Sequence, residues 1–185
     1  MAFPAWRPCL GGLAAGDTYD SIEGIIGGAG DDQLTGNDQA NYLEGGAGDD
    51  LLSGGAGEDV LVGGLGDDVL SGGAGRDSFV WRAGDTGGTD TISDFYIDPT
   101  GANSDVIDLS DLLSAVDTDG GGLDGYLNFA FGESTTISIS LTPGGDSVQD
   151  ITLNGLDLSS FYGTSDEAAV IANLIDDNAL KVDNA

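Results

Sequence analysis

The chain has 185 residues, of which 33 are acidic and 4 are basic, so its formal net charge at pH 7 is −29. This charge argues against binding to DNA, RNA or an anionic membrane, because those partners require clustered Lys and Arg. No apolar run approaches the roughly 20 residues that span a bilayer, and the lone Cys9 has no partner for an intrachain disulfide. We therefore expect cations as partners and no membrane insertion.

The amino-terminal residues 1–16 carry Trp6, Arg7 and Pro8 where a secretory signal peptide would have a basic start and a clean apolar stretch. We assign this segment to no domain. Residues 17–26 have apolar side chains three apart and are expected to form a lead-in coil for the repeats that follow.

Six nonapeptides of the form Gly-Gly-x-Gly-x-Asp-x-apolar-x fill residues 27–80 without a gap. A short fixed period predicts a solenoid. Glycines at positions one, two and four permit a tight turn, and positions seven to nine form a short strand with position eight facing inward. Two units make one coil, so each turn stacks on the turn two units along the chain. The inward residues are Leu34, Leu43, Leu52, Leu61, Leu70 and Phe79.

The gaps between stacked turns are expected to be lined by carbonyl and carboxylate oxygens. Such ligands suit Ca²⁺, and the chain has no His and only one Cys to offer zinc or copper. Pairing each unit with the unit two further on leaves four gaps, and we expect about three to five calcium ions. The second unit is degenerate, with Asn37, Gln39 and Asn41 in place of two glycines and the Asp. The gap between the second and fourth units is therefore predicted to be the weakest.

The repeats are predicted to fold only when calcium binds. Six inward side chains form a small core for this length of chain, and residues 27–80 carry eleven acidic residues against one Arg, a net charge of −10. Binding of calcium would offset most of that repulsion and supply folding free energy. The alternative is a flexible Gly/Asp-rich linker, which does not explain an apolar residue at one place in every nine.

Residues 85–93 resemble one further, decayed unit that follows an insertion at residues 81–84. Gly88, Asp90 and Ile92 occupy its positions four, six and eight. Asp90 and Asp94 are therefore candidate ligands at the far end of the repeats, with simple solvation of the two carboxylates as the alternative. Together, residues 17–93 are predicted to form a parallel β-roll, which is a β-solenoid.

After residue 94 glycine becomes less frequent and strand patterns appear at residues 105–109, 126–131 and 135–141. In the last of these, Ile and Leu alternate with Thr and Ser, which indicates a sheet with one face in water. A turn at residues 143–146 leads to a returning strand, which is marked by Val148, Ile151 and Leu153.

A helix is predicted next, because Thr164 and Glu167 form a capping box ahead of an apolar face. A short apolar tail follows at residues 179–182. The expected fold is therefore all-β: the calcium-stabilised roll, then a β-rich capping domain with one helix at residues 94–185. Open solenoid ends need such caps. The apolar face of the helix consists of Val170, Ile171, Leu174 and Ile175.

The nonapeptides resemble those of the RTX (repeats-in-toxin) family. Residues 90–95, 105–113, 126–127 and 135–138 are similar to the C-terminal target domain of large bacterial RTX proteins, often adhesins, that use type I secretion. This resemblance implies an uncleaved C-terminal signal that a type I ABC transporter complex reads. It also implies a secreted chain, extracellular or on the bacterial cell surface, that folds on extracellular calcium.

The resemblance also implies the calcium ligands. They would be the sixth-position residues together with turn carbonyls of the glycines at positions one and four. The ligand set comprises Asp32, Asn41, Asp50, Asp59, Asp68, Asp77 and Asp90, with Gly27, Gly30, Gly45, Gly48, Gly54, Gly57, Gly63, Gly66, Gly72 and Gly75.

We expect no catalysis by this chain. Without His there is no His-based triad and no HExxH zinc helix, and its paired carboxylates recur at the repeat spacing, which a single active site would not require. Two alternatives remain open: an adhesin-type module that binds a cell-surface or glycan ligand, and a non-catalytic tail of a secreted protease or lipase. A contact patch, if these residues are not core, would comprise Tyr126, Phe129, Phe131, Phe161 and Tyr162.

Overall fold

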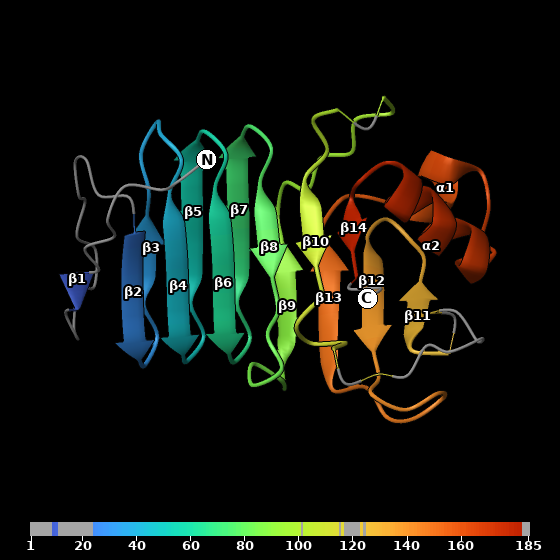
Figure 1. Cartoon of the computed structure of the whole chain (residues 1–185), viewed down its shortest axis with the longest axis horizontal. Coiled ribbons are helices and arrows are strands. Elements are labelled where there is room, and N and C mark those ends of the chain that lie inside the picture. Colours follow the sequence, from blue (N-terminus) through green and yellow to red (C-terminus); the bar gives the residue numbers. More distant parts are fainter. Residues whose placement is uncertain are drawn as a thin grey trace.

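A computed structural model describes residues 9–10, 24–100, 102–114, 116, 123 and 125–182. Within these residues two seven-stranded sheets lie face to face, and the coils stack along the long axis of the molecule (Figure 1). Sheet A runs in the order β1 (Cys9–Leu10), β2 (Gly24–Ala29), β4 (Tyr42–Ala47), β6 (Val60–Leu65), β8 (Ser78–Val80), β10 (Val106–Asp108) and β14 (Leu180–Lys181). Sheet B runs in the order β11 (Leu127–Ala130), β12 (Thr135–Ile139), β13 (Gln149–Leu153), β9 (Thr89–Ile92), β7 (Val69–Ala74), β5 (Leu51–Ala56) and β3 (Gln33–Thr35).

The repeats stack in parallel at a register of two units. Leu43 pairs with Leu61 in sheet A, and Leu52 pairs with Leu70 in sheet B. Successive units alternate between the sheets, so two units make one coil, as predicted. The inward side chains meet between the sheets, where Leu43, Leu52 and Leu61 have no exposed surface. The sequence prediction of a parallel β-roll is confirmed for the described residues, and residues 17–23 of the predicted lead-in coil lie outside them.

The strands are longer than the three residues predicted. Each full strand covers positions seven to nine and the first three positions of the next unit, because these glycines also pair across coils, as Gly46 does with Gly64. Gly64 and Gly66 have φ values of 116° and 130°, which L side chains rarely adopt. A Cβ at Gly64 would also collide with the Gly46 carbonyl. Glycine at these positions is therefore needed for both torsion and spacing.

Leu61 lies at the middle of this core, so its truncation gives a direct test of the packing. We expect Leu61→Ala to lower the free energy of unfolding of the calcium-loaded protein by about 2–5 kcal/mol, because the lost contacts leave a cavity. Val69, 40% exposed on the outer face of β7, is the control, and Val69→Ala should cost about 0.5 kcal/mol or less. Chemical denaturation in saturating calcium measures both; equal losses would contradict this core arrangement.

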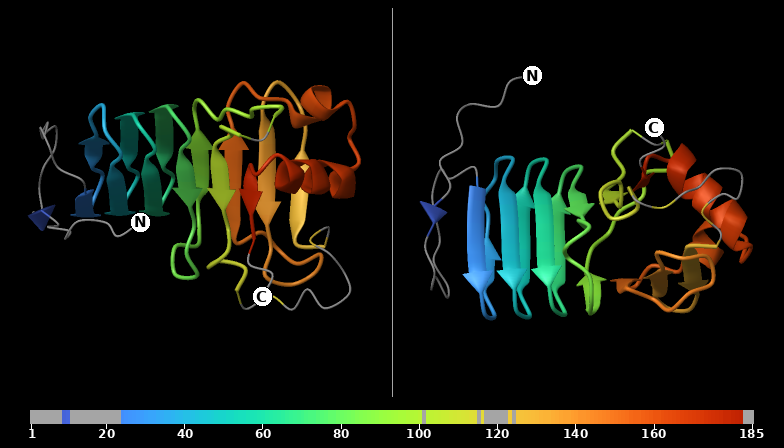
Figure 2. Two further views of the ribbon diagram at one scale, coloured as in Figure 1. Left: turned by 45° about the horizontal axis from the view of Figure 1, so that its top comes forward. Right: turned by 60° about the horizontal axis from the view of Figure 1, so that its bottom comes forward.

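The cap extends the same two sheets. In sheet A, β10 pairs in parallel with β8 and with β14. In sheet B, β13 pairs in parallel with β9, and then β12 and β11 follow as antiparallel strands (Figure 2). The hairpin of β12 and β13 confirms the predicted turn and returning strand. One cluster of buried apolar side chains runs from the repeats into the cap, so both parts share a core.

Two helices lie at the cap end: α1 (Leu158–Tyr162), which was not predicted, and α2 (Glu167–Asp176). The predicted capping box is wrong. Asp166 is the N-cap of α2 and accepts a hydrogen bond from the Ala169 N–H at 3.0 Å. Glu167 therefore stands in the first turn, and its carboxylate accepts from the Phe129 N–H at 3.1 Å. Neither helix in the described residues has the length and apolar character that crossing a membrane requires.

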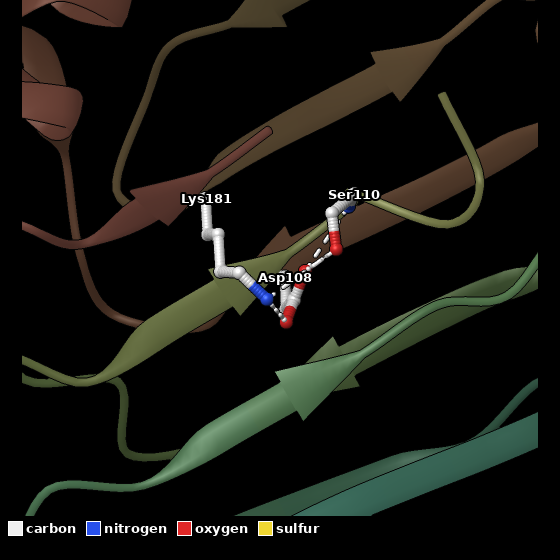
Figure 3. A network of polar contacts seen from close by, with 3 residues as sticks. All are labelled: Asp108, Ser110 and Lys181. Carbon is white, nitrogen blue, oxygen red and sulfur yellow. Dashed lines mark hydrogen bonds and ion pairs between the residues drawn. The ribbon is translucent and has the colours of Figure 1, made fainter. Parts of the chain in front are cut away.

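The C-terminal strand β14 is fixed to its neighbour β10 in the cap by a small polar network (Figure 3). Asp108 of β10 pairs with Lys181 of β14, and the Lys181 Nζ lies 2.7 Å from the Asp108 Oδ2. The Ser110 N–H donates to the Asp108 Oδ1 at 3.0 Å. Burial acts to raise the pKa of Asp108, but the hydrogen bonds from Lys181 and Ser110 outweigh it and lower that pKa. The Asp108 carboxylate is thus ionised and paired with Lys181 at the edge of sheet A that β14 forms.

Candidate calcium sites

The sixth-position side chains form two rows along the turns. In each row the Oδ1 of one side chain accepts a hydrogen bond from the main-chain N–H of the preceding member. The Asp50 N–H donates to the Asp68 Oδ1 at 2.8 Å, and the Asp59 N–H donates to the Asp77 Oδ1 at 2.9 Å. Row 1 contains Asp32, Asp50, Asp68 and Asp90, and row 2 contains Asn41, Asp59, Asp77 and Asp105.

The second carboxylate oxygen, Oδ2, of the interior aspartates in both rows lacks a hydrogen-bond donor in the described chain. The Oδ2 atoms of Asp50, Asp59, Asp68 and Asp77 are buried and have no hydrogen-bond partner within the part of the chain that the structure describes. Leaving a charged acceptor buried without a donor is expensive. These four oxygens therefore call for positive charge.

The surroundings of these oxygens supply further acceptors. A Cβ placed on Gly27 would lie 2.5 Å from both the Asp32 Oδ2 and the carbonyl oxygen of Gly45 in the next coil. The same pairing of a carboxylate with the next coil's carbonyl recurs beside Gly45 and Gly54. Glycine at position one thus leaves room for two acceptors to approach each other, and a cation would satisfy both.

The donor set fits calcium. No three acidic, Cys or His side chains converge anywhere in the described ranges, so carboxylates alone would not hold an ion. Main-chain carbonyls must complete the shell, and calcium accepts six to eight oxygens that include backbone carbonyls. The carboxylates of Asp50, Asp59, Asp68 and Asp77 would each help to hold an ion together with such carbonyls, and the ions would offset their negative charge.

Burial raises the pKa of Asp50, Asp59 and Asp68 to about 6. Main-chain hydrogen bonds oppose this effect, while nearby carboxylates reinforce it: Asp68 acts on Asp50, and Asp77 acts on Asp59. Without calcium, therefore, each row holds like charges that repel one another in a poorly solvated place.

A pH dependence follows for the calcium-free chain. Because the folded pKa is above the usual 3.8, protonation favours the folded state; this stabilisation is fully present below about pH 4 and is lost as the pH rises through about 6. We expect circular dichroism in EGTA to show more β-structure at pH 4.5 than at pH 7.5. Calcium affinity at pH 5.5 should be lower than at pH 7.5, because protons compete. Equal β content at both pH values would contradict the expectation.

The degenerate second unit differs from the others. The Asn41 Oδ1 accepts from the Asn37 N–H of its own turn at 2.7 Å, and the Gln39 N–H donates to the Asn37 Oδ1 at 2.8 Å. The Asn41 oxygen lies beside Gly36 as the Asp oxygens lie beside their own glycines. It is neutral and already has a donor, so this gap stays the one predicted to be weakest.

The structure places Asp90 in row 1, after Asp68, despite the insertion between them. Asp94 lies outside the rows; its carboxylate accepts from the Gly72 and Gly73 N–H groups at 3.1 and 3.0 Å. The sequence analysis missed Asp105, which follows Asp77 in row 2 after a long loop. Residues 105–108 match positions six to nine of the repeat, and that pattern could have revealed it.

The five aromatic residues considered as a contact patch are divided between core and surface. Tyr126 and Phe129 are buried, and the rings of Phe129 and Phe131 stack at 5.8 Å. Phe161 is 41% exposed and meets Tyr162 edge-on at 4.9 Å. They therefore do not form a continuous exposed patch.

Comparisons with known proteins agree with this geometry. A family model for RTX calcium-binding nonapeptide repeats matches residues 25–52 and 44–79. Two solved subunits of the Azotobacter vinelandii mannuronan C5-epimerase are similar: AlgE6R3 with 31% identity and AlgE6R2 with 30%, each with a TM-score of 0.55. The match to AlgE6R3 covers 82% of this chain and 84% of that one, and the match to AlgE6R2 covers 85% and 91%.

A comparison with curated protein sequences gave no match. The family model describes calcium-binding nonapeptide repeats, the similarity to the solved subunits extends over most of the chain, and the turns carry buried oxygens that require a cation. The chain therefore belongs to the RTX calcium-binding nonapeptide repeat family, and its repeats form a calcium-binding parallel β-roll.

Proposed function

We propose that this chain is a calcium-triggered folding module of a secreted protein. The observation that carries the proposal is that the buried Oδ2 atoms of the sixth-position residues Asp50, Asp59, Asp68 and Asp77 have no hydrogen-bond partner among the described residues. Extracellular calcium modules bind at about 10⁻⁴ to 10⁻³ M. Sites of that affinity would be empty in the cytosol and filled outside, so the location of the chain would decide whether the repeats fold.

We assign the interior aspartates as the calcium ligands: Asp50, Asp59, Asp68 and Asp77, with Asp32 at the open end of row 1. Their partners in the shell are main-chain carbonyls of the next coil. Support comes from the approach of the Asp50 Oδ2 to the Gly63 carbonyl beside Gly45, and of the Asp59 Oδ2 to the Gly72 carbonyl beside Gly54. The number of calcium ions bound by an Asp59→Asn variant tests this assignment.

The C-terminal residues are proposed to carry a type I secretion signal. In the folded chain Ala179 has no exposed surface and Leu180 is 5% exposed, so this segment is accessible to a receptor mainly before folding. Low cytosolic calcium would keep the repeats unfolded and suited to a narrow channel. Export and calcium-dependent folding would then both follow from the low stability of the calcium-free repeats.

A fusion experiment tests the signal. A passenger protein that carries residues 126–185 at its C-terminus should be exported by bacteria that have a type I transporter, and the passenger without them should stay in the cell. The matched control is the same passenger fused to residues 24–93, which should not be exported. Unchanged secretion after removal of residues 126–185 from the full fusion would refute the signal.

A ligand-binding role, in an adhesin or beside an enzyme, is the second candidate. The observation in its favour is the similarity to subunits of a mannuronan C5-epimerase. With a net charge of −29, binding of an anionic polysaccharide would have to be bridged by calcium. Affinity electrophoresis in gels that contain mannuronan, with calcium or EGTA, should show calcium-dependent retardation; equal mobility with and without the polymer would exclude that ligand.

A further inference from the structure

The last aspartate of row 1 differs from the interior ones. The Asp90 Oδ1 accepts from the Asp68 N–H at 3.0 Å, as the pattern of the row requires. Its Oδ2, however, accepts from the Trp81 Nε1–H at 2.6 Å and from the Gln149 amide group at 2.9 Å. All three side chains are at most 2% exposed. The Oδ2 atom, which at Asp50 and Asp68 lacks a donor among the described residues, has two donors here.

Row 2 ends in the same way. The Asp105 Oδ1 accepts from the Asp77 N–H at 3.0 Å, and the Asp105 Oδ2 accepts from the main-chain N–H of Tyr96 at 2.8 Å. Asp105 is 3% exposed. The two rows lie at different turns and close with different donors, but in both the second oxygen of the final aspartate is bonded to the protein.

We propose that Asp90 and Asp105 end the two rows as hydrogen-bonded terminators that do not bind calcium. The N–H groups of Trp81, Gln149 and Tyr96 take the place that the cation takes at interior aspartates. This inference rests on the proposed assignment of the interior aspartates as calcium ligands. A cation at Asp90 would have to displace two buried hydrogen bonds, which is costly.

The insertion at residues 81–84 acquires a role from this arrangement. Trp81 stands nine residues after Gly72, where the period would place another first-position glycine. In the repeats that glycine leaves space beside the carboxylate, whereas an indole fills space and supplies an N–H. Gln149 comes from β13, the first cap strand beside β9. Both donors to Asp90 therefore come from outside the repeats: one from the insertion that follows the last repeat and one from the cap.

A competing arrangement places a cation between Asp90 and Gln149. The Gln149 Oε1 is buried without a partner among the described residues, and a rotated amide would turn this oxygen toward Asp90 as a ligand. Its present orientation lets the amide group donate to Asp90 and to the Asp150 carbonyl, the latter at 3.2 Å. The two arrangements differ in the number of ions bound, which can be measured.

Asp90→Asn and Asp68→Asn form a matched pair in the full chain, each removing one carboxylate from row 1. Isothermal titration with calcium should show one ion fewer for Asp68→Asn and an unchanged number for Asp90→Asn. Asp90→Asn should instead lower the Tm of the calcium-saturated protein by about 5 °C, because the Asn NH₂ group would face the N–H donors of Trp81 and Gln149 and could not accept from them. Loss of one ion in Asp90→Asn would overturn the inference alone. An unchanged number in both variants would overturn the ligand assignment and the inference with it.

Gln149→Met keeps the Asp90 carboxylate and the size of the side chain, so it serves if Asp90→Asn does not fold. It removes both the amide donor and the amide oxygen. If Asp90 ends row 1 without binding calcium, Gln149→Met should bind at least as many calcium ions as the wild type. Equilibrium dialysis with ⁴⁵Ca measures this number. One ion fewer would mean that the Gln149 oxygen is a ligand and would overturn the inference.

Discussion

Chelating calcium is expected to unfold the repeats of this chain. In excess EGTA at pH 7.5, circular dichroism should lose most of its β signal, and amide hydrogens of residues 24–93 should exchange rapidly. Addition of calcium should restore both. The unfolding should be cooperative, because each coil packs on its neighbours and each calcium ion would be held by oxygens from two stacked turns.

The physical reason lies in the two rows. Without a cation, the Oδ2 atoms of Asp50, Asp59, Asp68 and Asp77 stay buried and without a donor in the described chain, and residues 27–80 carry a net charge of −10. Each unit contributes one large side chain, at position eight, to the apolar cluster between the sheets. Core burial on this scale does not compensate for such a concentration of unscreened charge together with the entropy of ordering so many glycines.

Two controls make this expectation specific. Magnesium at the same ionic strength should restore little structure, because it prefers a small octahedral shell and retains water. Sodium chloride should also have a small effect, because it screens exposed charges but does not supply a ligand for a buried oxygen. A full β signal in excess EGTA at pH 7.5 would contradict the calcium-dependent fold.

The repeat period accounts for what the sequence could predict. A strict spacing of nine determines that Leu43 lies under Leu61 and that Asp50 lies beside Asp68, since the register of one coil determines the next. The family resemblance and the absence of His allowed calcium to be predicted as the bound metal. None of this required knowledge of distant contacts.

What could not be predicted depends on contacts that break the period. Gln149 reaches Asp90 from 59 residues away, and Asp105 joins row 2 only after a loop whose length no repeat rule specifies. The Glu167 carboxylate, expected to bond within its own helix start, accepts instead from the Phe129 N–H, which lies 38 residues away in the sequence. Such features follow from tertiary packing, which local patterns do not encode.

Asp59→Asn is expected to remove one calcium ion and to raise the calcium concentration at the folding midpoint about tenfold or more. Asp59 is 1% exposed, its Oδ1 accepts from the Asn41 N–H at 2.7 Å, and its Oδ2 has no partner in the described chain. Asn can keep the first hydrogen bond. It cannot supply the negative charge that the cation requires, and a tenfold rise of the midpoint corresponds to about 1.4 kcal/mol for each ion that binds on folding.

The neighbouring residue supplies the control. Glu58 is exposed and precedes Asp59 in the same turn, so Glu58→Gln removes an equal charge from nearly the same place. If calcium only screens the general charge of the roll, both variants will shift the folding midpoint alike. If the ion sits on Asp59, only Asp59→Asn will lose an ion, and Glu58→Gln will shift the midpoint less than about twofold, as expected for an exposed charge. Equal behaviour of the two variants in a calcium titration would refute the assignment of Asp59 as a ligand.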